Sequence, residues 1–179
     1  MKKRYIQFLK GCIALIITVT VLYSGQAIWQ NYAVDLPLDR TLHGIAGVEK
    51  VTWDDSRIND KISINVTLNN IANLQETYEE INEKIKKTLK SNEYNLEIYD
   101  NRTPELEQAY YEIHYYIQKA VVDGDFPMLA EKVQENASAS GASAKVYVDE
   151  GHIYLQMAKG DSSLYSVVAR HSGRIGGDF

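Results

Sequence analysis

The amino end of this 179-residue chain constrains its fold and location more than any other part. The basic cluster Met1-Lys2-Lys3-Arg4 precedes an apolar stretch that extends over the 19 residues from Gly11 to Trp29. A helix of that length is about 28 Å long, close to a hydrocarbon core of about 30 Å. The sequence therefore predicts a basic cytoplasmic segment over 1–10 and a transmembrane helix over 11–29. The residues expected to anchor it in the membrane are Ile13, Leu15, Ile16, Ile17, Val19, Val21, Leu22 and Trp29.

A secretory signal peptide is the alternative interpretation of the same segment. Its strictly apolar core, Gly11 to Tyr23, has only 13 residues, and Gly25 and Ala27 would be the small residues before a cleavage after Ala27. Both interpretations give one topology, because the basic residues precede the apolar stretch and the positive-inside rule places them in the cytoplasm. We expect a single-pass protein of the cell membrane with its C-terminal domain outside, or a secreted protein if the leader is cleaved.

The charge of the chain is unevenly distributed. Residues 1–34 contain four basic and no acidic residues, whereas residues 35–179 contain 15 basic and 24 acidic residues, a net charge of −9. An acidic body repels the phosphate backbone of nucleic acids, so we expect no nucleic-acid partner. The partners that we do expect are the membrane and either a second copy of the chain or another envelope protein.

The side chains that carry catalysis or bind metals do not form a recognisable motif. The four histidines have no HExxH spacing, and the single cysteine, Cys12, lies within the apolar stretch. Ser162 and Ser163 lack a GxSxG context, and acidic pairs such as Asp149-Glu150 are interpreted as solvated turns. We therefore expect no enzymatic activity, no catalytic residues, no bound metal and no cofactor.

The body of the chain alternates between helical and strand patterns. Asn73 and Glu76 form a capping box before an apolar stripe of helical spacing, and Thr103-Pro104 is typical of a helix start. Alternating apolar and polar residues predict strands instead. The expected order is a connector over 30–37, a helix over 38–47, a hairpin of strands 48–53 and 61–68, a helix over 74–89, a strand over 94–99, a helix over 104–122, a weaker helix from 128, and a meander of strands 145–148, 153–157 and 164–168.

This order predicts an α+β fold, in which a mixed, mainly antiparallel sheet carries helices on one face. The extracytoplasmic domain is expected over 38–171, with candidate sub-lobes 38–122 and 123–171, followed by a flexible tail over 172–179. The helix-strand-strand-helix-strand order of residues 38–99 resembles the ring-building and BON-like modules that bacterial envelope proteins carry behind a single membrane span. The whole chain resembles uncharacterised single-span membrane proteins of Gram-positive, spore-forming bacteria. The resemblance implies assembly or partner docking outside the membrane and carries over no catalytic residue.

A cluster of aromatic residues on the expected helix over 104–122 is the candidate partner face. Leu106, Ala109, Ile113, Ile117 and Ala120 already form an inward stripe. Four tyrosines, Tyr110, Tyr111, Tyr115 and Tyr116, cover more of the circumference than that stripe needs. Tyrosine combines an apolar ring with a polar tip and is enriched at interfaces. Two interpretations stay open at this point: these rings bind a partner, or the second sub-lobe covers them. A small-ligand sensor with a pocket between the sub-lobes is the alternative function.

Overall fold

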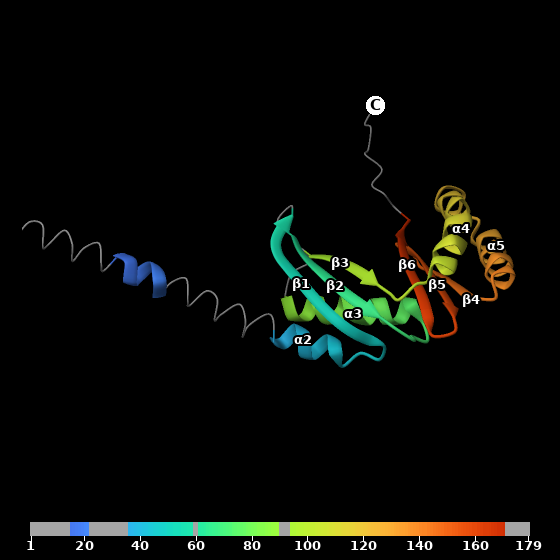
Figure 1. Ribbon diagram of the computed structural model, residues 1–179. Helices are drawn as coiled ribbons and strands as arrows, with labels where there is room; N and C mark the ends of the chain where they lie inside the picture. Colours follow the sequence, from blue (N-terminus) through green and yellow to red (C-terminus); the bar gives the residue numbers. More distant parts are fainter. Residues whose placement is uncertain (1–14, 22–35, 59–60, 90–93, 171–179) are drawn as a thin grey trace, which may run out of the picture. The chain divides into compact units, whose positions relative to one another are not determined.

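A computed structural model describes residues 15–21, 36–58, 61–89 and 94–170 (Figure 1). The chain divides into two units, Met1–Thr41 and Leu42–Phe179. The described residues contain helices and two three-stranded sheets, so the α+β class expected from the sequence is confirmed. The expectation of one sheet is wrong, because strands β1 to β3 and strands β4 to β6 form separate sheets.

The first unit contains a helix over residues 15–21. Five of the residues expected in the membrane lie in it, and their exposed fractions are 57–66%: Leu15, Ile16, Ile17, Val19 and Val21. Ile13, Leu22 and Trp29 lie outside the described residues. Within the described ranges, no helix is both long and apolar enough to cross a bilayer.

Helix α2 (Leu36–His43) begins inside the segment expected to be a connector. The helix can begin here because a proline such as Pro37 is tolerated in the first turn of a helix. The backbone N–H that proline lacks would have no hydrogen-bond acceptor within the helix at that position. Leu38, Leu42 and Ile45, which the helical spacing singles out, are all buried. The helix ends before Gly47, whose φ of +84° lies in the left-handed region.

The first sheet consists of β1 (Val48–Ile58), β2 (Lys61–Leu68) and β3 (Tyr94–Tyr99). β1 and β2 form the expected antiparallel hairpin, and β3 pairs with β2 in parallel. A parallel neighbour needs a crossover connection, which α3 (Leu74–Leu89) supplies along one face of the sheet (Figure 1). Asn73 is confirmed as the residue that caps α3: its Oδ1 accepts the backbone N–H groups of Gln75 at 3.0 Å and of Glu76 at 3.4 Å. The Glu76 carboxylate accepts a hydrogen bond from the side-chain amide of Asn73 at 2.8 Å, which makes this a variant of the capping box.

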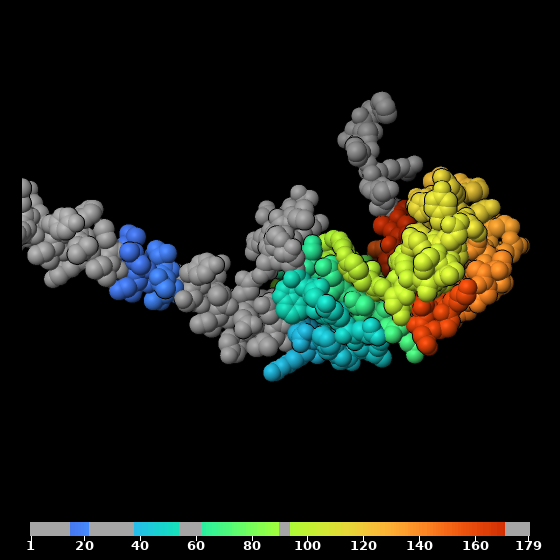
Figure 2. All heavy atoms as spheres, viewed as in Figure 1, coloured from blue at the N-terminus to red at the C-terminus, as the bar shows by residue number. Residues whose placement is uncertain are grey.

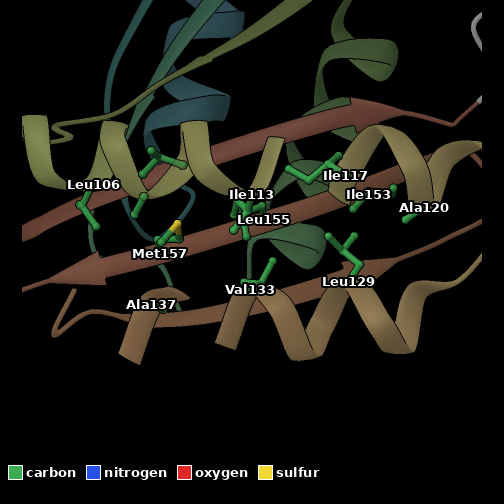
Figure 3. Close-up of a cluster of buried hydrophobic side chains, with 12 residues drawn as sticks. Leu106, Ile113, Ile117, Ala120, Leu129, Val133, Ala137, Ile153, Leu155 and Met157 are labelled. Atoms are coloured by element: carbon green, nitrogen blue, oxygen red, sulfur yellow. The ribbon is translucent and has the colours of Figure 1, made fainter. Parts of the chain in front are cut away.

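The second sheet is the expected antiparallel meander of β4 (Ser143–Val148), β5 (His152–Lys159) and β6 (Ser162–Ala169). Helices α4 (Pro104–Asp123) and α5 (Phe126–Ala139) pack together and against it. Thr103 caps α4 by accepting the N–H of Leu106, and Asp125 caps α5 in the same way at Met128. Figure 3 shows how side chains of α4, α5 and β5 converge in this core. It is formed by Leu106, Ala109, Ile113, Ile117, Ala120, Leu129, Val133, Ala137, Ile153, Leu155, Met157 and Leu164.

Helix α4 therefore packs with the strands that follow it. The candidate sub-lobe 38–122 would instead group this helix with the first sheet. Its whole inward stripe lies in the core shared with β5. The segment between β3 and α4 explains why the two sheets stay separate. Asp100 Oδ2 accepts the N–H of Tyr165 at 2.7 Å, and Asn101 Oδ1 accepts the N–H of Ser163 at 2.8 Å. Two N–H groups of β6 are thus occupied by side chains, where a merged sheet would pair them with a strand.

Strand β5 connects the second sheet to α3, because both of its faces are covered. Ile153, Leu155 and Met157 face α4 and α5, and the residues between them point the other way. Among these, Gln156 donates to the carbonyl of Ile71 at 2.8 Å and accepts the N–H of Leu74 at 3.2 Å. This side-chain amide holds the start of α3 against β5 and thereby fixes the walls of the cleft described next.

Candidate functional site

A cleft of about 620 Å³ lies between α3, β3 and the beginning of β5. Helix α3 contributes Tyr78, Glu79, Asn82, Glu83 and Lys86. Strand β3 contributes Tyr94, Asn95 and Leu96, and the other wall is formed by Asp149, His152 and Tyr154. Three carboxylates thus line the cleft together with one lysine and one histidine, so its character is acidic and aromatic.

Asp149 organises the turn between β4 and β5. Its Oδ1 accepts the backbone N–H groups of Gly151 and His152, both at 2.6 Å, and its Oδ2 accepts the hydroxyl of Tyr154 at 2.6 Å. Partial burial of the carboxyl group acts to raise the pKa of Asp149, but these three hydrogen bonds outweigh it and the pKa lies below its usual range. Asp149 is therefore a carboxylate that is held in one orientation at the wall of the cleft.

Tyr154 is the complementary member of this pair. Burial of its side chain, which is 1% exposed, raises the pKa of its hydroxyl, and the hydrogen bond to the Asp149 carboxylate raises it further. A phenol in this state donates a hydrogen bond and does not act as a base at neutral pH. Neither group is poised to exchange a proton near pH 7, so what the pair does in this structure is hold the Asp149 carboxylate in place.

Three rings form an aromatic cluster beside this pair. The centroids of Tyr78 and His152 are 5.7 Å apart, those of Tyr78 and Tyr154 are 5.6 Å apart, and those of His152 and Tyr154 are 5.8 Å apart. Tyr78 and His152 also line a second cavity of about 510 Å³ that lies between the edges of β3 and β6. Aromatic faces next to carboxylates attract organic cations, which is what this arrangement offers chemically.

The tyrosines predicted to form a partner face separate into two groups. Tyr110 packs against the core of the second sheet, and its hydroxyl accepts that of Ser166 at 3.3 Å. Tyr116 is 38% exposed and lines a cavity with Lys132 of α5. Tyr111 and Tyr115 are 63% and 71% exposed. Figure 2 shows α4, coloured yellow-green to yellow, at the surface of the face in view. Tyr110 therefore fits the interpretation that the second sub-lobe covers these rings, whereas Tyr111 and Tyr115 are exposed as a partner face requires.

The remaining residues considered for chemistry stay apart. His114 lies between Tyr110 and Tyr115 at centroid distances of 5.9 and 6.0 Å, His152 lies in the cleft, and His171 is outside the described residues. Across the described ranges, no group of three or more His, Cys, Asp or Glu side chains is arranged to hold a metal ion.

The sequence does not indicate this cleft. The sequence predicts a solvated turn residue at Asp149, but its carboxylate accepts three hydrogen bonds in the structure. A local signal for the turn did exist, because Asp followed by Gly two residues later is typical of a side chain that accepts hydrogen bonds from its own turn. Nothing local in the sequence indicates that Tyr78 and Tyr94 lie on the opposite wall.

Comparison of the chain with protein-family models, with curated proteins and with solved structures gives no match.

Because the pKa of Asp149 is lowered in the fold, we expect the free energy of unfolding to fall as the solution is made acidic. A group whose pKa is lower in the folded than in the unfolded state stabilises the fold above the unfolded pKa, about 3.9 for Asp, and loses this effect as the pH falls through the folded value. In Asp149→Asn this contribution is absent at every pH. We expect the variant to be less stable than the original chain at pH 7, and the difference to shrink steadily below about pH 4.

Urea unfolding of the full chain between pH 2.5 and 7 measures this difference. The matched control is Glu150→Gln, which changes the exposed neighbouring residue and is expected to follow the original chain at each pH. A difference between Asp149→Asn and the original chain that stays constant down to pH 2.5 would show that the carboxylate is not preferentially stabilised in the fold.

Proposed function

We propose that this chain is a single-pass membrane protein whose α+β body lies outside the cytoplasm and docks another protein or a second copy of itself, without catalytic activity of its own. The basic cluster and the 19-residue apolar stretch support the anchor and its orientation. The exposure of all five apolar side chains between Leu15 and Val21 supports it too, because a helix with such a surface is stabilised by an apolar environment.

The observation that carries the docking role is the exposure of Tyr111 and Tyr115. The inward stripe of α4 is fully buried, so neither ring is needed for the core of the second sheet. Large rings with polar tips contribute strongly to protein interfaces and are costly to leave in water. Their position side by side on the outward face of a 20-residue helix is typical of a surface that binds protein.

A second candidate function is the binding of a small ligand in the cleft between α3 and β5. The cluster of Tyr78, His152 and Tyr154 next to Asp149 favours it, because this surface combines aromatic faces with a fixed carboxylate. Small amines and quaternary ammonium compounds have the matching chemistry.

Chemical cross-linking of cells that express the full chain tests the proposal. We expect a membrane-impermeant, amine-reactive reagent, added from outside, to give cross-linked products in the membrane fraction. We also expect Tyr111→Ser together with Tyr115→Ser to reduce them about tenfold or more, because two interface anchors are removed. Tyr99→Ser, at another exposed tyrosine of 49% exposure, is the matched control and should leave them unchanged.

The possible outcomes separate the parts of the proposal. Products that form only with a membrane-permeant reagent would place the body in the cytoplasm and overturn the topology. A chain that gives no products with either reagent, and whose melting temperature rises with choline or spermidine, would favour the ligand-binding function instead.

A further inference from the structure

The Asp149 carboxylate keeps one acceptor site free at the wall of the cleft between α3 and β5. Its Oδ1 accepts two backbone N–H groups, from Gly151 and His152, and its Oδ2 accepts the hydroxyl of Tyr154. A carboxylate oxygen has two lone pairs, so Oδ1 is saturated and Oδ2 can take one further donor. The side chain is 29% exposed and lines the cleft, so this remaining site is accessible to a ligand.

Glu79 supplies a second carboxylate, on the α3 wall of the same cleft. Its charge and that of Asp149 both act on the Tyr154 hydroxyl and raise the pKa of that group, so the two carboxylates lie around one side chain. In the part of the chain that the structure describes, neither Asp149 nor Glu79 pairs with a lysine or an arginine. The third carboxylate of the cleft, Glu83, differs because Lys87 pairs with it at 2.5 Å. Two negative charges of the cleft therefore lack a cationic partner among these residues.

An aromatic surface lies beside these two carboxylates. Tyr78, the neighbour of Glu79 in α3, is half-buried, and its ring centroid is 5.6 Å from that of Tyr154 and 5.7 Å from that of His152. A hydrocarbon chain can pack against such rings and lose its contact with water. The lysine of the cleft, Lys86, lies about 10 Å further along α3 than Glu79, so the end of the cleft at Tyr78 stays negative.

We propose that this cleft binds a linear diamine or polyamine, with one primary ammonium group on Asp149, a second on Glu79, and the methylene chain between them against Tyr78. The proposal rests on the second candidate function, ligand binding in this cleft, and does not involve docking through Tyr111 and Tyr115. It also narrows the class of ligand. A primary ammonium group has N–H donors for the free site on Oδ2, whereas a quaternary ammonium group has none. A ligand with a single charge would leave one carboxylate without a partner.

Calorimetric titration of the full chain in a non-ionic detergent tests the class of ligand. At about pH 8, where histidine is neutral and alkylammonium groups are charged, we expect putrescine to bind about tenfold more tightly than butylamine. The reason is that the diamine adds one charge-assisted hydrogen bond. Choline is expected to bind no more tightly than butylamine. In the series from diaminopropane to diaminooctane the affinity should pass through a maximum, because one chain length fits two carboxylates at a fixed separation. General attraction to an acidic protein has no such optimum.

Two substitutions assign the two ammonium sites. Glu79→Gln should lower the affinity for putrescine about tenfold, to that of butylamine, and should leave butylamine binding unchanged, because a single ammonium group prefers the preorganised carboxylate of Asp149. Asp149→Asn should weaken the binding of both amines. The matched control is Glu80→Gln, which changes the next residue of α3, lies outside the cleft and should alter neither affinity. Glu79 and Glu80 are exposed, and circular dichroism verifies that each variant is folded.

The outcomes separate this proposal from the functions proposed above. Butylamine or choline binding as tightly as putrescine, with a loss in Asp149→Asn, would overturn the diamine as the ligand class, while ligand binding in the cleft would stand. Equal losses for Glu79→Gln and Glu80→Gln, or no binding of any of these compounds, would overturn both the diamine site and the second candidate function. Neither result bears on docking, which is tested by cross-linking through Tyr111 and Tyr115.

Discussion

Leu129→Ala is expected to lower the free energy of unfolding by about 2–5 kcal/mol, the range for truncating a fully buried leucine. Leu129 is 0% exposed and lies in the core that α4 and α5 share with β5 (Figure 3). Its removal loses burial of the side chain and leaves a cavity between three elements that cannot all move inward. The measurement is urea unfolding of the full chain, read from the midpoint at constant slope.

Glu131→Ala is the matched control for this prediction. It makes the same substitution two residues along the same helix, at an exposed position, and is expected to change stability by no more than about 0.5 kcal/mol. A small loss for Leu129→Ala, similar to that of the control, would contradict the assignment of α5 to this core.

Gly47→Ala is the second substitution with a large expected effect. Gly47 has a φ of +84°, and a Cβ at this position would lie 2.3 Å from Cγ2 of Ile71 and 2.9 Å from the carbonyl oxygen of Asn69. The left-handed backbone costs a residue with a side chain about 1–2 kcal/mol, and overpacking typically adds about 1–3 kcal/mol. The neighbouring backbone cannot easily give way, because the N–H of Asn69 donates to the carbonyl of Gly47 at 2.9 Å.

Gly124→Ala separates the two contributions. Gly124 has a similar φ of +74°, but no atom lies within 4 Å of the Cβ that alanine would add. Its expected loss is the backbone contribution alone, so thermal or urea unfolding should show a clearly larger loss for Gly47→Ala. Equal losses for the two variants would show that the segment around Ile71 moves aside at little cost.

The local elements of this fold could be predicted from the sequence where one physical pattern dominates. The alternation of Lys61–Leu68 and of Tyr94–Tyr99 predicts both strands with the boundaries that the structure has. The capping residues Asn73 and Thr103 likewise predict the starts of α3 and α4. These signals are strong because they depend only on interactions of a residue with its own backbone or with its neighbours in sequence.

The division into two sheets could not be predicted in the same way. It depends on Asp100 and Asn101 accepting N–H groups from Tyr165 and Ser163, which lie more than 60 residues along the chain. The cleft was missed for the same reason, since its walls come from distant segments. The sequence does indicate that some tyrosines of α4 lie outside the core, because the inward stripe already fills the buried face of the helix. Tyr111 and Tyr115 are the ones most exposed in the structure.

The side chains of Asp100 and Asn101 have a consequence beyond keeping the two sheets apart. A border strand with open N–H groups is a template on which another polypeptide can add itself, and growth of this kind leads to aggregates. At Ser163 and Tyr165 those donors are already saturated from within the same molecule. The Asp100 carboxylate and the Asn101 amide therefore protect this edge of β6 against the addition of a strand from another molecule.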